Sequence, residues 1–102
     1  MKLKSIAYIF LGPGLNLKEH RTQLGHDNFT CTMVGIDFNH KEQVISVAKE
    51  LVANGVQLIE LCGGFGPLWV AKVSEALDSK IPVGSVAYGP ETRQPILDLL
   101  SD

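Results

Sequence analysis

The stretch from Leu58 to Pro67 constrains the fold of this chain more than any other part of the sequence. It reads LIELCGGFGP, an apolar run followed by a glycine cluster and then by Pro67, a residue favoured in the first turn of a helix. This order predicts a β-strand, a tight loop and a helix start. Such a junction presents unpaired backbone N–H groups and the positive end of a helix dipole, so it favours an anion or a thiolate.

Similar apolar segments recur along the chain and alternate with segments of helical spacing. The apolar runs predict four strands, over residues 3–11, 29–36, 56–61 and 81–87. Between them, capping-box pairs and closing glycines predict helices over 17–24 and from Asn39 to Gly55, and a third helix starts at Gly66. We expect a further short helix over residues 96–100.

Alternation of strands and helices predicts a single α/β domain over residues 1–102. Thr30 and Thr32 give the second predicted strand a polar face, which is typical of an edge position. We therefore expect a four-stranded, mostly parallel sheet with strand order 2-1-3-4 and helices on both faces. The alternative is half of a (βα) barrel that a partner chain completes.

Charge and cysteine usage exclude several classes of protein. A net charge of −2 with scattered Lys and Arg residues leaves no basic patch for nucleic acid. The basic start and apolar run over residues 1–11 lack a cleavage site and are too short for a bilayer, so we expect no membrane association. Two cysteines without framework spacing indicate a reduced, cytoplasmic protein. The three histidines have no metal-ligand spacing, so we expect neither a metal site nor a cofactor.

The loops that follow parallel strands gather at one edge of a sheet, which is where such folds bind ligands. Three glycines within four residues at 63–66 favour close approach of the backbone to a ligand, although the spacing matches no nucleotide-binding motif. Phe65 is expected at the exposed tip of this loop. The predicted ligand-binding residues are Gly12, Gly14, Gly63, Gly64, Phe65, Gly66, Tyr88 and Arg93.

Glu60 and Cys62 are the candidate catalytic residues. Alternate strand residues point to the same face, so these two side chains lie about 6.5–7 Å apart along the strand. A carboxylate and a thiol on one face suit proton-transfer or nucleophilic chemistry. The structural alternatives are a Glu60 that braces the turn and a Cys62 that fills space in the core.

The motif ELCGGFGP and the segments around it resemble a small uncharacterised bacterial family, a domain of unknown function. The similarity extends over most of the chain, including the first strand with its Gly-Pro-Gly loop and residues 48–52 and 81–84. It implies no activity. The third and fourth βα units also resemble parts of (βα) barrel enzymes, a likeness that concerns the fold alone.

Three functions remain open from the sequence. The first is binding of a small anionic metabolite at the loop over residues 62–67. The second is an enzyme that uses Cys62 or Glu60 on a small molecule. The third is a homodimeric structural or interaction module, because the C-terminal segment carries an apolar surface made of Ile96, Leu97, Leu99 and Leu100.

Overall fold

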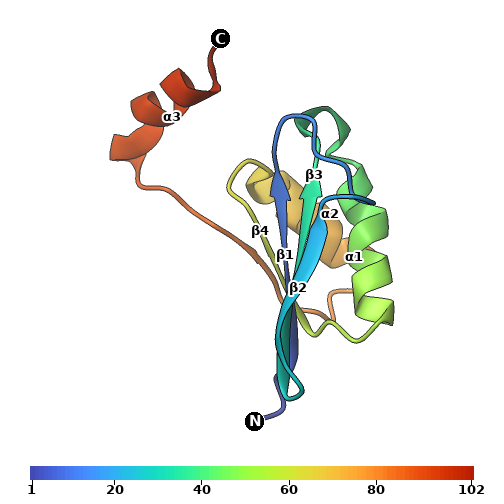
Figure 1. Ribbon diagram of the computed structural model, residues 1–102. Helices are drawn as coiled ribbons and strands as arrows, with labels where there is room; N and C mark the ends of the chain where they lie inside the picture. Colours follow the sequence, from blue (N-terminus) through green and yellow to red (C-terminus); the bar gives the residue numbers. More distant parts are fainter.

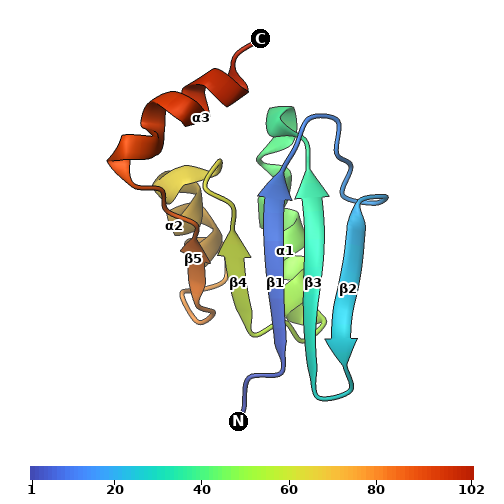
Figure 2. The ribbon, with the colours of Figure 1, turned by 60° about the vertical axis from the view of Figure 1, so that its left-hand side comes forward.

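The strands of the sheet lie in the order β2-β3-β1-β4-β5 in the computed structural model, which describes residues 1–102 (Figure 2). β2 is antiparallel to β3, and the other neighbouring strands are parallel. The α/β class is confirmed, whereas the sheet is mixed and has five strands rather than four. The strand bounds are β1 Ser5–Leu11, β2 Arg21–His26, β3 Phe29–Ile36, β4 Leu58–Leu61 and β5 Val83–Ser85.

Three α-helices and two 3₁₀ turns connect or follow the strands. The longest helices have 11 residues, and none is long and apolar enough to cross a membrane. The bounds are η1 Phe38–His40, α1 Gln43–Ala53, α2 Gly66–Ala76, η2 Pro90–Thr92 and α3 Arg93–Leu100.

The core lies between the sheet and two helices, α1 and α2. Every second residue of β1 points into it, and its members form one continuous apolar cluster. Fully buried side chains from the strands and helices include Ile9, Val34, Val47, Ile59, Leu61 and Val73. Both helices therefore cover the same face of the sheet (Figure 1).

The helix predicted over residues 17–24 is absent, and the second half of this segment belongs to β2. Asn16 starts one helical turn, since its carbonyl accepts hydrogen bonds from the N–H groups of Glu19 and His20, but the turn does not continue. Gly25 has φ +137°, and a Cβ there would lie 2.1 Å from the carbonyl oxygen of Phe29. The glycine expected to stop a helix instead permits the close β2–β3 hairpin.

This replacement explains why helices do not cover both faces of the sheet, contrary to the prediction. The predicted helix would have connected β1 to β3 across the second face. The chain instead makes this connection with β2, which lies in the plane of the sheet. The half-barrel alternative is also wrong, because β1 lies between β3 and β4 and the strands therefore do not follow chain order.

The last helix, α3, stands apart from the rest of the molecule. An extended segment over residues 86–89 leads away from β5, and α3 lies beyond the C-terminal ends of the strands, on the side opposite α1 (Figure 1). The molecule is elongated, with principal extents of 41 × 27 × 23 Å and a radius of gyration of 14.1 Å. A compact chain of this length has a radius of gyration of about 13 Å.

Candidate functional site

A cavity of about 800 Å³ lies at the C-terminal edge of the parallel strands, between the uncovered face of the sheet and α3. Its position between β1 and β4 is where the strand order reverses, the usual ligand position in open α/β sheets. Ten of its twelve lining residues are hydrophobic. The lining consists of Tyr8, Phe10, Leu11, Met33, Phe38, Cys62, Gly63, Gly64, Tyr88, Ile96, Leu99 and Leu100.

Tyr8 and Phe10 form the floor of this cavity. They are alternate residues of β1 and point away from the core, with their rings stacked at a centroid distance of 6.0 Å and an interplanar angle of 15°. Burial raises the pKa of the Tyr8 phenol, and the nearby Cys62, Tyr88 and Glu60 raise this pKa further. The phenol therefore stays protonated at neutral pH and can donate a hydrogen bond into the cavity.

Cys62 follows the last residue of β4 and contributes a thiol to the cavity wall. Its backbone N–H donates to the carbonyl of Ile9 at 3.0 Å, which extends the pairing between β1 and β4. Its Sγ accepts a hydrogen bond from the backbone N–H of Leu11 at 3.3 Å. These two contacts fix the thiol at the edge of the sheet. The side chain is partly exposed, so the position predicted from the sequence is accessible.

Two of the predicted loop glycines, Gly63 and Gly64, line the cavity. A Cβ at Gly63 would lie 2.7 Å from Cε2 of Tyr88 and 3.0 Å from the carbonyl oxygen of Val86. Absence of a side chain at Gly63 thus lets the Tyr88 ring lie against the loop. At Gly64 the nearest atom to a Cβ would be Cδ1 of Leu11 at 3.3 Å. The absence of a side chain at Gly64 therefore widens the cavity only slightly.

Phe65 and Gly66 do not reach the cavity. Phe65 is buried in the core with 4% of its surface exposed, so the expected exposed loop tip is wrong. Gly66 has φ +78°, and a Cβ there would meet no atom within 4 Å. It begins α2 from a backbone conformation that side chains disfavour. The strand-loop-helix junction itself is confirmed, and its third glycine serves the turn.

Gly12, Gly14 and Arg93 also lie outside the cavity. A Cβ at Gly12 would meet Cδ1 of Leu15 at 2.6 Å, so this loop packs against its own side chain. Gly14 lines a separate polar depression, and Arg93 lines a small depression together with Gly89 and Leu97. Of the eight predicted ligand-binding residues, the structure brings together Gly63, Gly64 and Tyr88.

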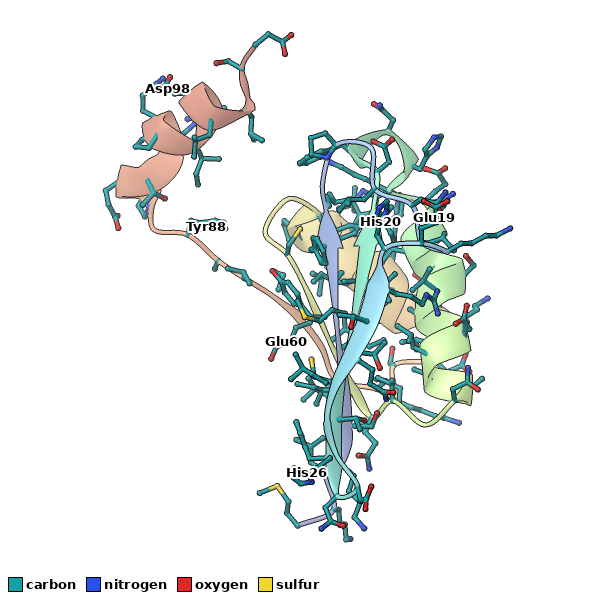
Figure 3. The ribbon with its side chains drawn as sticks, in the orientation of Figure 1. Glu19, His20, His26, Glu60, Tyr88 and Asp98 are labelled. Carbon is teal, nitrogen blue, oxygen red and sulfur yellow. The ribbon has the colours of Figure 1, made fainter.

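Glu60 is exposed to solvent, and it does not line the cavity (Figure 3). Its expected burial rested on helices covering both faces of the sheet. Because no helix covers this face, the carboxylate needs no partner and makes no ion pair. Glu60 and Cys62 are both close enough to Tyr8 to affect the pKa of its phenol. The predicted pair therefore shares one face, and both residues lie near Tyr8.

Sequence reasoning missed the aromatic floor of the site. Tyr8 and Phe10 belong to a strand that was expected to be buried, where a continuous apolar run carries no information about which face binds a ligand. The available signal was the i, i+2 spacing of the two aromatic residues.

A protein-family model described as "Family of unknown function (DUF6506)" matches residues 4–101 of the chain. The comparison with curated proteins found no match.

Proposed function

Since the chain belongs to this family of unknown function, we propose from the geometry that it binds a small, mainly apolar molecule carrying an uncharged hydrogen-bond acceptor. The cavity between Tyr8, Cys62 and Tyr88 is the observation that carries the proposal. Its volume of about 800 Å³ falls within the usual range for ligand pockets, about 300–1,000 Å³.

The chemistry of the lining selects an uncharged ligand. No Lys, Arg or His side chain lines the cavity, so an anion has no cationic partner there. The carboxylate of Glu60 acts on Tyr8 from nearby, and it disfavours a second negative charge. The protonated phenol of Tyr8 offers a donor, and the stacked rings of Tyr8 and Phe10 offer a flat apolar surface. The anion predicted from the glycine loop stays a prediction.

Titration with two molecules of the same shape and different charge tests this proposal. We expect benzamide to shift the amide resonances of Tyr8, Met33 and Gly63 in ¹H–¹⁵N spectra, and benzoate to do so more weakly. Inorganic phosphate should leave them unchanged. No shift at these residues with any probe at millimolar concentration would contradict the proposal, and preference for benzoate or phosphate would favour the anion.

A variant without the Tyr8 hydroxyl tests the role of this hydrogen-bond donor. Tyr8→Phe should weaken benzamide binding by up to about tenfold, because one neutral hydrogen bond contributes about 0.5–1.5 kcal/mol. Leu68→Ala is the matched control, since Leu68 lies on α2 with 66% of its surface exposed and does not line the cavity. It should bind benzamide like the unmodified protein.

A reaction at Cys62 is the second candidate function. The thiol lies on the cavity wall, accessible from the ligand space and fixed by the Leu11 N–H. We expect iodoacetamide to label Cys62 in the folded protein, with Cys31→Ser used to remove labelling of the other cysteine. Benzamide should slow the labelling. Labelling only after unfolding would exclude a nucleophilic role for this residue.

A further inference from the structure

The C-terminal helix α3 is held to the rest of the molecule by few interactions. The last hydrogen bond between the two parts runs from the backbone N–H of Val86 to the carbonyl of Leu61 at 3.0 Å. Beyond it, no hydrogen bond or ion pair links residues 87–102 to residues 1–86. Figure 2 shows the same separation, with α3 lying beyond the ends of the strands. The position of α3 therefore depends on the backbone torsions of a short segment.

The joint within this segment is short. Residues 90–100 form one body, because η2 leads directly into α3. Thr92 secures the start of this body by donating from its backbone N–H and from Oγ1 to the carbonyl of Gly89, at 3.0 and 2.7 Å. Ala87 and Tyr88 lie between this body and the sheet, and both are exposed and outside any helix or strand. Hinges in proteins are typically a few such loop residues, which absorb a change in φ and ψ.

One side of α3 is apolar and faces the cavity. Ile96, Leu99 and Leu100 follow at helical intervals of three and four residues, and all three line the cavity. Gln94 and Asp98 are joined by a hydrogen bond of 2.9 Å on the opposite side of the helix, and they do not line the cavity. A movement of α3 toward the sheet would therefore bury its apolar side and leave its polar side in water.

The two walls of the cavity are incompletely packed. Leu99 has 84% and Leu100 has 62% of its surface exposed, although both line the cavity. On the sheet, the stacked rings of Tyr8 and Phe10 are only partly buried. Both walls thus keep apolar surface in contact with water, and an approach of α3 to the rings would remove this surface from water.

We propose that α3 is a lid, which turns about Ala87 and Tyr88 and closes over a molecule lying on the rings of Tyr8 and Phe10. The helix that closes is that of the same chain, since its side chains already line this cavity. The lid rests on the proposed function, because the bound molecule supplies the apolar surface between the rings and α3. Closure encloses the ligand between two apolar walls, which disfavours a charged ligand. It also makes release of the ligand depend on the opening of α3.

Intermolecular NOEs test closure in the full-length chain with methyl-labelled leucine. At saturation, the ring protons of benzamide should give NOEs both to the rings of Tyr8 and Phe10 and to the methyls of Leu99 and Leu100. The heteronuclear ¹H–¹⁵N NOEs of residues 87–100 should rise when benzamide is added. NOEs to the rings without NOEs to the methyls would overturn the lid and leave the binding proposal intact. Absence of NOEs to the rings as well would overturn both.

A disulfide cross-link tests closure without a ligand. A disulfide forms only when two Cα atoms come within about 7 Å of each other, so it reports an approach of α3 to the cavity wall. Leu100→Cys, combined with Cys31→Ser, should form an intrachain disulfide with Cys62 under mild oxidation, detected by mass spectrometry. Asp98→Cys in the same background is the control on the polar side of α3 and should cross-link several-fold more slowly. Equal rates at the two positions, or cross-links only between two chains, would overturn the proposal.

Leu99→Ala measures the contribution of the lid to ligand release. It should raise the dissociation rate of benzamide several-fold and change the association rate little, because fewer apolar contacts hold α3 closed. Line shapes in the titration spectra give both rates. Leu97→Ala is the matched control, since Leu97 lies on the same helix with 47% of its surface exposed and does not line the cavity. It should leave both rates unchanged, and equal effects of the two substitutions would overturn the assignment of α3 as a lid.

Discussion

At the scale of single residues, the site depends on which side chains are absent as much as on those present. Gly63 lies in the loop after β4 and Gly84 lies in β5, the strand that pairs with β4, yet their surroundings differ. A Cβ at Gly63 would meet the Tyr88 ring, whereas a Cβ at Gly84 would have nothing within 4 Å. Neither residue has a positive φ, so contact alone distinguishes them.

Gly63→Ala should therefore displace the Tyr88 ring from the cavity wall. We expect a loss of about 1 kcal/mol in the free energy of unfolding, at the low end for overpacking, because the exposed Tyr88 ring can turn away. The Tyr88 ring resonances should shift. Gly84→Ala is the control and should change stability by less than about 0.5 kcal/mol. Similar effects of the two substitutions would show that the Tyr88 contact does not exist in solution.

Tyr8 gives the protein a pH dependence at alkaline pH. The pKa of its phenol is raised above the ordinary value of 10.0, so the folded state holds this proton more tightly than the unfolded state. This contribution to stability is complete below pH 10 and is lost as pH rises above 10 through the folded-state pKa. Urea unfolding at pH 8 and pH 11 should show a smaller loss of stability for Tyr8→Phe than for the unmodified chain. An equal loss would exclude a raised pKa.

At the scale of elements, β2 is the unexpected part of the fold, and a single side chain connects it to α1. The guanidinium of Arg21 donates from Nη1 to Oε2 of Glu50 at 2.7 Å and from Nε to the carbonyl of Leu17 at 2.9 Å. The ion pair is partly exposed, and its charge contributes little by itself. The fork of two hydrogen bonds matters more, because it holds the edge strand and the loop before it.

Arg21→Lys should lower the free energy of unfolding by about 0.5–1.5 kcal/mol, because lysine cannot make both hydrogen bonds at once. Glu50→Gln keeps the Leu17 contact and should cost less than about 0.5 kcal/mol. Chemical denaturation of the two variants measures the difference. If Glu50→Gln proves the more costly change, the ion pair and not the fork anchors β2.

The elements that the sequence predicted correctly are those whose spacing is set by the core. Val44, Val47 and Leu51 mark α1, and the apolar run over residues 29–36 matches β3, because burial against one face produces these patterns. The β2 strand could not be recognised, since the capping-box pair Asn16 and Glu19 before it and Gly25 within it suit a helix equally well, and its only apolar side chain is Leu24. That one error also misplaced Glu60, because burial of Glu60 depended on a helix over the second face. For the same reason the aromatic floor of the site was missed.

At the scale of the whole molecule, α3 stands apart from the sheet and leaves Leu97, Leu99 and Leu100 exposed. If a second copy of the chain covers these side chains, the folded chain gains stability by mass action. The melting temperature should then rise with protein concentration over the range of about 1–100 μM, and Leu99→Asp should remove this dependence. A melting temperature of the unmodified chain that stays constant over this range would contradict an obligatory partner.

The central place of β1 also has a consequence during translation. β1 leaves the ribosome before both of its neighbours, and its second neighbour, β4, ends at Leu61, about fifty residues later. At a synthesis rate of about 5–20 residues per second, the apolar segment SIAYIFL stays without its full set of partners for some seconds. Nascent chains of this protein should therefore bind chaperones that recognise extended apolar segments, and release them only when β4 has emerged.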